Sequence, residues 1–225
     1  MSSPSSPAPA PAPTSTPTPQ SPTFLSILGP PGSGKGTQCA LLAQRFKHCV
    51  HLSIGDLLRE EAQDPSSPYA EVLRENLRCG RLGAREMTCG ILASRIERIR
   101  GVEFRDGGDG VENEKEVVVL LDGFPRQLET AEYFEQTVGP IHRFLVFQCP
   151  TSIIEQRLQA RKRNDDDVDT IRKRIEIYEL RTLKVLERYD EKGKVTKVDA
   201  SEDVDAVARA LGESLKGVGV VLEER

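Results

Sequence analysis

Residues 24–38 read "FLSILGPPGSGKGTQ", a short apolar run followed by a glycine-rich loop. A phosphate-binding P-loop has the pattern G-x-x-x-x-G-K-[ST], preceded by a strand and followed by a helix. Residues 29–35 match this pattern, but Gly36 occupies the hydroxyl position and Thr37 comes one residue late. The apolar run predicts the strand, and "TQCALLAQRFK" (37–47) predicts the helix. We therefore predict a phosphate-binding loop, with a simple glycine turn before a helix as the structural alternative.

The phosphate contacts follow from the chemistry of this loop. Glycines allow backbone N–H groups to approach an anion, the helix N-terminus adds partial positive charge, and a lysine reaches the β- and γ-phosphates. The residues expected to bind ATP phosphates are Gly32, Ser33, Gly34, Lys35, Gly36 and Thr37.

Apolar runs and helix-like stretches alternate along the rest of the chain, which predicts an α/β fold. Five runs are candidate strands: 24–28, 49–53, 117–121, 143–147 and 194–198. The run "VVVLL" (117–121) is apolar without alternation, which is typical of a parallel strand covered on both faces. The prediction is a P-loop NTPase-type, doubly wound, five-stranded parallel sheet with its ligand at the carboxyl ends of the strands.

Composition divides the chain into a tail and one domain. Residues 1–22 are almost entirely Pro, Ser, Ala and Thr, so we expect a disordered tail. Residues 23–225 are expected to form a single domain, and 101–116, rich in Gly and acidic residues, to be a surface loop.

Charge and cysteine content exclude several classes of protein. The 31 Lys and Arg nearly balance the 35 Asp and Glu, which does not indicate binding to nucleic acid or a membrane. The five cysteines are scattered, and we see no signal or transit peptide and no membrane-spanning run. These features predict a cytoplasmic protein, with the nucleus as a second location.

The stretch "VVVLLDGFPR" (117–126) provides a second signal. Asp122 ends a predicted buried strand beside the P-loop, where a carboxylate can orient Mg²⁺ or its waters. Arg126, four residues on, can face the phosphates. Acids commonly end strands, but beside a P-loop Asp122 becomes a Walker B candidate, that is, an acid that orients Mg²⁺.

Five arginines are candidates for the charge that phosphoryl transfer requires. The transferred group spreads negative charge over several oxygens, which convergent guanidinium groups neutralise. The alternative is that they are ordinary solvated surface charges. The candidates are Arg59, Arg126, Arg161, Arg163 and Arg174.

Four motifs together resemble one known family. "GPPGSGKGTQ" (29–38), "HLSIGDLLREE" (51–61), "LLDGFPR" (120–126) and "RNDDDVDTIRKRIEIY" (163–178) are similar, in order and spacing, to the adenylate kinase and UMP-CMP kinase family of nucleoside monophosphate kinases. The resemblance runs from about residue 24 to residue 216, and "GKVTKVDASEDVDAV" (193–207) looks closer to eukaryotic UMP-CMP kinases.

The resemblance implies an activity: an ATP- and Mg²⁺-dependent monomeric enzyme that phosphorylates a pyrimidine nucleoside monophosphate. It also implies a helical monophosphate-binding segment at about 53–85 and a short lid at about 161–167. The implied catalytic residues are Lys35, Asp122, Arg126, Arg161, Arg163 and Arg174. The implied monophosphate-binding residues are Ser53, Arg59, Gly123, Arg126, Thr130, Arg163 and Arg174. Asp165 and Asp166 are expected to bind lid arginines when the lid closes.

The sequence departs from the family pattern in several places that bear on substrate and activity: Thr130, Ile54, the segment "RLGAR" (81–85) and the lid. Thr130 stands where the family usually has an amide that hydrogen-bonds the acceptor base, and Gln127 is expected to point elsewhere. Only Lys162 separates Arg161 from Arg163, which shortens the lid. Adenylate kinase activity, nucleotide binding without catalysis, and a small non-nucleotide acceptor therefore remain open.

We expect the histidines and cysteines to be structural residues. His48, His51 and His142 show no metal-ligand spacing along the chain, so structural or surface roles are expected. The cysteines are expected to be small core residues.

Overall fold

The computed structural model describes residues 22–103, 117–160 and 168–225, in which five strands alternate with helices. All five predicted strands are confirmed: β2 has the predicted bounds, and the ends of the other four differ from the prediction by at most two residues. In chain order the elements are β1 (Thr23–Leu28), α1 (Lys35–Arg45), β2 (Cys49–Ser53), α2 (Ile54–Gln63), α3 (Ala70–Cys79), α4 (Arg85–Glu103), β3 (Val118–Asp122), α5 (Leu128–Thr137), β4 (Ile141–Gln148), α6 (Thr151–Ala160), α7 (Val168–Ile177), a turn of π-helix (Tyr178–Thr182), α8 (Leu183–Asp190), β5 (Val195–Asp199) and α9 (Val204–Gly217).

The strands form one parallel sheet in the order β2-β3-β1-β4-β5. The chain leaves β1 toward β2 and β3 on one side and later continues toward β4 and β5 on the other. Such a reversal creates a crevice at the carboxyl ends of the strands, where ligands of open α/β sheets bind. The predicted fold class is confirmed, and the switch point lies directly after β1, at the P-loop.

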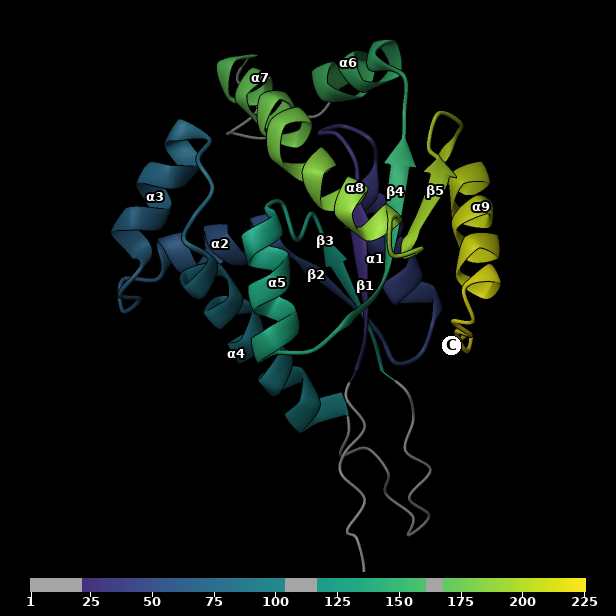
Figure 1. The fold of residues 1–225 in the computed structure, drawn as a ribbon, viewed down its shortest axis with the longest axis horizontal. Coiled ribbons are helices and arrows are strands. Elements are labelled where there is room, and N and C mark those ends of the chain that lie inside the picture. The colour runs from purple at the N-terminus through teal and green to yellow at the C-terminus, as the bar shows by residue number, and fades with distance from the viewer. Residues whose placement is uncertain (1–21, 104–116, 161–167) are drawn as a thin grey trace, which may run out of the picture.

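Two apolar layers cover the sheet, because alternate residues of each strand point to opposite faces. On one face Phe24, Val119 and Phe144 belong to a core built with side chains of α4, α5 and α8. On the other face Leu25 and Leu120 belong to a core built with α1 and α9. Figure 1 shows the same arrangement, with α9 and α5 on opposite sides of the strands. The strand β3 is buried on both faces, as its unbroken apolar run predicts.

Helices α2, α3 and α4 form a lobe beside the sheet. A small separate core of Ala62, Leu73 and Met87 holds them together. Figure 1 shows α3 on the outer flank of this lobe and α6 and α7 at the carboxyl edge of the sheet. Between α7 and α8 lies the single π-helical turn, a feature that often occurs at functional sites. These elements surround the crevice.

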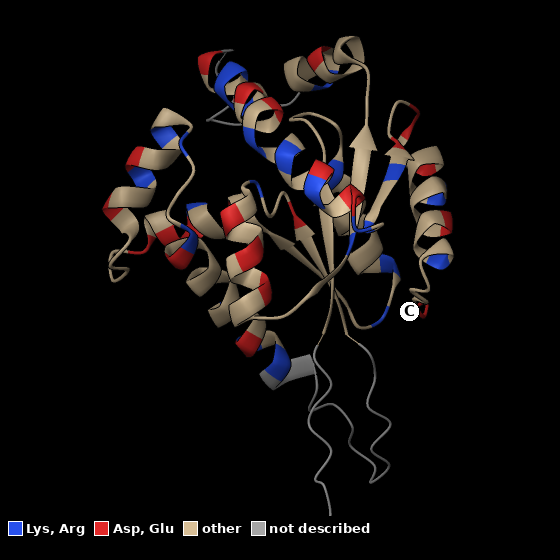
Figure 2. Cartoon of the chain, in the orientation of Figure 1, with Lys and Arg blue, Asp and Glu red and all other residues tan. Residues whose placement is uncertain are grey.

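The charges on the helices are mostly mixed. Figure 2 shows Lys and Arg interspersed with Asp and Glu on most helices, whereas α5 carries acidic residues and no basic ones. Across the described part of the chain, no helix combines the length and the apolar character needed to cross a bilayer.

Candidate active site

A cavity of about 870 Å³ opens at the carboxyl edge of the sheet. Its walls come from the loop after β1, the ends of β2 and β3, the lobe of α2 to α4, the helices α6 and α7, and the segment between β5 and α9. It combines glycine-rich backbone, several arginines and apolar side chains in one concave surface. Its position at the topological switch point makes it the candidate active site.

The loop after β1 has a backbone that favours glycine at two positions. Gly32 and Gly34 have φ values of 85° and 92°, in the left-handed region. A Cβ at Gly32 would also lie 2.9 Å from the Cγ of Leu158, so α6 packs directly on the loop. Gly34 is the N-cap of α1 and has no side-chain cap, so the N–H groups of the first helical turn are available to an anion.

The Lys35 ammonium curls back over this loop. Its Nζ donates hydrogen bonds to the carbonyl oxygens of Gly29 (2.9 Å) and Pro30 (2.8 Å) and lies 3.3 Å from the Ser33 hydroxyl. The ammonium therefore lies beside the loop backbone, within reach of a phosphate bound by the loop. All six residues predicted to bind ATP phosphates, Gly32, Ser33, Gly34, Lys35, Gly36 and Thr37, line the cavity.

The Asp122 carboxylate faces the start of α1 from the end of β3. A Cβ at Gly36 would lie 3.2 Å from its Oδ2, so glycine at the position of the missing hydroxyl leaves room for this carboxylate. Asp122 Oδ2 also lies 3.2 Å from His51 Nε2. Burial, and then the Asp122 charge, raise the pKa of the neighbouring Cys39 thiol well above its ordinary value. The interpretation of His51 as a structural residue missed its contact with the predicted metal-binding group.

Three of the predicted arginines, Arg59, Arg126 and Arg174, line the same cavity and lie near one another. Arg126 donates from Nε to the Gly123 carbonyl oxygen (2.8 Å), while Arg59 pairs with Asp56 at 2.5 Å. Desolvation lowers the pKa of Arg126, and the nearby Arg174 and Arg59 charges lower it further, against the opposing effect of Asp122. Like charges held this close indicate a site shaped for an anion. Arg126 is therefore not a solvated surface charge, and Arg59 and Arg174, which are partly buried, line the cavity with it.

The wall beyond these arginines is polar but uncharged. Thr130 is buried, and its hydroxyl donates to Gln127 Oε1 at 3.5 Å; both residues line the cavity. Gln127, which was expected to point elsewhere, thus lies beside Thr130 and lines the same cavity. Ser53 also lines it, although its hydroxyl already caps α2 by accepting from the Asp56 N–H.

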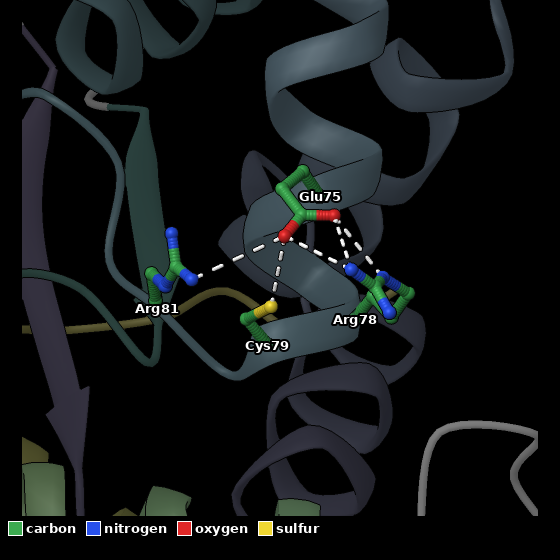
Figure 3. A network of polar contacts seen from close by, with 4 residues as sticks. All are labelled: Glu75, Arg78, Cys79 and Arg81. Atoms are coloured by element: carbon green, nitrogen blue, oxygen red, sulfur yellow. Dashed lines mark hydrogen bonds and ion pairs between the residues drawn. The ribbon is translucent and has the colours of Figure 1, made fainter.

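The network in Figure 3 lies at the end of α3. Glu75 accepts hydrogen bonds from Arg78 at 2.8 Å and from the Cys79 thiol at 3.1 Å, and Arg81 lies 4.0 Å away. The hydrogen bond from Cys79, and then the one from Arg78, hold the pKa of the Glu75 carboxyl below its usual value. These contacts are local to the last turns of α3, next to Gly80 and Arg81, which line the cavity.

Sequence reasoning missed one arginine at the P-loop side. Arg157 of α6 donates to the carbonyl oxygens of Ala200 and Glu202, each at 2.8 Å, and its Nη1 is the nearest atom to a Cβ placed on Gly34. It thereby ties α6 to the segment after β5 and forms part of the cavity wall. A helix of mixed charge offers no sequence signal that would single it out.

Several predictions concern residues outside the described ranges. These are residues 1–21 of the tail, residues 104–116 of the predicted loop, and the lid with its residues Arg161, Arg163, Asp165 and Asp166. Residues 101–103, predicted as the start of the loop, are instead the last residues of α4, because the helix continues past its predicted end. Every other predicted site residue lines the cavity.

Known proteins match the chain over most of its length. The sequence model of the adenylate kinase family matches residues 27–194. A uridylate kinase of Schizosaccharomyces pombe is 35% identical over 80% of this chain and 91% of its own length. UMP-CMP kinases of Lentinula edodes and Xenopus tropicalis are each 36% identical, covering 82% and 83% of this chain and 82% and 93% of their own lengths. The P-loop, the acid after β3 and the converging arginines thus occur in a chain that belongs to the adenylate kinase family.

Proposed function

We propose that this protein transfers the γ-phosphoryl group of ATP to UMP or CMP, forming ADP and a pyrimidine nucleoside diphosphate. The observation that supports this best is that one cavity is lined both by the P-loop with Lys35 and by a second basic group, Arg59, Arg126 and Arg174. A site for a single phosphate ligand would need only the P-loop. Two basic groups in one cavity suit a donor and an acceptor, and the names of the relatives, uridylate kinase and UMP-CMP kinase, support a pyrimidine acceptor.

The cavity residues have two tasks: they bind the phosphates of the two substrates, and they neutralise the negative charge of the transferring phosphoryl group. The amides of the P-loop and Lys35 hold the ATP phosphates, Thr37 adds a hydroxyl contact, and Arg157 borders the space for the adenosine. Arg59 and Arg126 hold the acceptor phosphate, whose oxygen forms the new bond to the γ-phosphorus as the bond to the leaving ADP oxygen breaks. No general base is needed, because the attacking group is already an anionic oxygen; positioning and charge neutralisation supply the catalysis.

The residues beside the P-loop fit Mg²⁺ bound with ATP. Asp122 offers a hard carboxylate ligand at the carboxyl end of β3, and Gly36 leaves open space beside it. The ion supplies charge neutralisation of the phosphates. Asp122 would hold it through water, and Arg174 complements it from α7.

We extend the proposal to residues outside the described ranges. Arg161 and Arg163 of the lid at 161–167 would approach the transferring phosphoryl, and Asp165 and Asp166 would bind lid arginines on closure. Residues 53–85 would form the monophosphate-binding segment of a single domain at 23–225, preceded by the tail at 1–22. The enzyme would act as a cytoplasmic, and additionally nuclear, monomer.

A panel of acceptors tests the function. With ATP and Mg²⁺ fixed, we expect kcat/KM for UMP and CMP to exceed that for AMP at least tenfold, with dCMP measured alongside. A tenfold preference for AMP, about 1.4 kcal/mol, would replace the pyrimidine assignment with adenylate kinase activity. ATP binding without phosphorylation of any monophosphate would instead indicate a protein that has lost catalysis.

We expect the Thr130–Gln127 pair to contact the acceptor base. Gln127→Leu removes an amide that can donate to or accept from a pyrimidine edge, so kcat/KM for UMP should fall about 5- to 30-fold, the equivalent of about 1–2 kcal/mol. Thr130→Val, which removes only the hydroxyl that orients the amide, should have a smaller effect in the same direction.

Gln136 gives a matched control, because it lies on the same helix and is exposed. Gln136→Leu should leave the kinetics unchanged, and KM for ATP should stay constant in all three variants. If Gln127→Leu keeps kcat/KM for UMP within twofold of the wild type, Gln127 does not read the base.

A further inference from the structure

We propose that Cys39, His51 and Asp122 form a binding site for Zn²⁺ in the floor of the cavity. The thiol, imidazole and carboxylate ligand atoms all lie within 4.8 Å of one another. Among the residues that the structure describes, this is the one group of three or more such side chains with this spacing. Sulfur, nitrogen and oxygen ligands of this kind are the set that Zn²⁺ takes in proteins.

Three neighbouring elements bring these side chains together. Asp122 of β3 is the register partner of Ser53, and His51 lies two residues before Ser53 on β2. Residues two apart on a strand share a face, so His51 and Asp122 meet diagonally and their side chains approach to 3.2 Å. Cys39 comes from the second turn of α1, which packs on this face of the sheet. All three positions are therefore supported by regular structure.

The site has an entry path and an open position. His51 and Asp122 line the cavity, whereas Cys39 is fully buried behind them. An ion that enters through the cavity would reach the carboxylate and imidazole first and the sulfur last. Three protein ligands leave the fourth tetrahedral position to water or a phosphate oxygen. On binding, the Cys39 thiol loses its proton to the buffer, so that the sulfur coordinates as a thiolate.

The sulfur ligand decides which ion the site favours. A thiolate ligand favours Zn²⁺ over Mg²⁺, because Mg²⁺ prefers oxygen ligands. Of the three side chains, Mg²⁺ would interact with Asp122 alone, through water. A bound Zn²⁺ occupies the carboxylate that the proposed function assigns to Mg²⁺·ATP. We therefore expect Zn²⁺ to inhibit the kinase, a consequence that rests on the proposed function, whereas the binding itself does not.

Metal binding is tested on the full, reduced chain without nucleotide. Zn²⁺ titrated in competition with a chromophoric chelator should bind at one equivalent, and Co²⁺ substituted for it should show a thiolate charge-transfer band. Removing a residue that hydrogen-bonds to a metal ligand typically lowers metal affinity about 10–100-fold. Removing a ligand itself should cost more, so Cys39→Ala and Cys39→Ser should each weaken Zn²⁺ binding at least about 100-fold. Cys49→Ala is the matched control: Cys49 is buried in the same core but is absent from the ligand group.

The outcomes separate the site from the function. A Co²⁺ complex of the wild type without a thiolate band, or equal Zn²⁺ affinity in folded Cys39→Ala and wild type, overturns the site. The spectrum of the wild type decides even if both Cys39 variants fail to fold. In kinase assays at fixed Mg²⁺·ATP, each rate is divided by the rate of the same protein without zinc. The Zn²⁺ concentration that gives half-inhibition should then be about 100-fold higher for the Cys39 variants than for Cys49→Ala. Thiolate-type binding without inhibition keeps the site and overturns its competition with Mg²⁺ at Asp122.

Discussion

Replacing Arg126 by methionine is expected to lower kcat/KM for UMP by about 10³-fold, the lower end of the range for an arginine that neutralises a transferring phosphoryl group. Arg126 is held by its hydrogen bond to the Gly123 carbonyl oxygen and lies near the charges of Asp122, Arg59 and Arg174. It is thus already oriented before substrate binds. Arg126→Lys should rescue little, because an ammonium cannot both donate to Gly123 and hold a phosphate with a planar pair of N–H groups.

Arg95 provides the control for Arg126. It forms a solvent-exposed ion pair with Glu60 on the same lobe of the molecule and does not line the cavity. Arg95→Met should change kcat/KM by less than twofold, because Arg95 lies outside the cavity. The protein should also stay folded, since exposed ion pairs contribute little to stability. A change of less than fivefold in Arg126→Met would remove Arg126 from the proposed mechanism.

Replacing Lys35 by methionine is expected to lower kcat/KM about 10²- to 10³-fold, the range found when one preorganised donor to developing charge is removed. In the structure the ammonium is held by the Gly29 and Pro30 carbonyl oxygens, so phosphates arrive at a charge that is already in place. Methionine keeps most of the side-chain volume and removes the charge together with its N–H donors. The loss should appear in kcat with ATP as well as in the affinity for ATP, measured by steady-state kinetics and equilibrium binding.

Lys47 is the corresponding control, because it is an exposed lysine paired with Glu223, away from the cavity. Lys47→Met should retain wild-type kinetics. If Lys35→Met binds ATP and turns over UMP at rates within fivefold of the wild type, the loop after β1 is not the donor site.

Local patterns carried much of the prediction. The five strands, the glycine-rich loop and the acid after β3 are all properties of short segments, in which alternation and backbone freedom are set by neighbouring residues. The strand ends were predicted less well: β4 runs from Ile141 to Gln148, longer than the predicted 143–147, because Ile141 still pairs with β1 and Gln148 with β5.

Side-chain direction could not be predicted in the same way. The position of Gln127 next to Arg126 suggested that it points away from the cavity. The extended backbone at Gln127 and the start of α5 at Leu128 instead bring its amide beside Thr130. A single residue with extended backbone before a helix changes the direction of its side chain, and the spacing from Arg126 does not predict that change.

The sequence by itself determined that this chain builds a parallel α/β sheet around a phosphate-binding loop, because strand period, glycine placement and the lysine all act within about fifteen residues. The tertiary structure decided which distant groups meet: the strand order places Asp122 beside His51 and brings α1 with Cys39 onto both. It also brought Arg157 to the P-loop and Arg174 to Arg126. Contacts between residues tens of positions apart depend on how helices pack across the sheet, and no spacing along the chain encodes that distance.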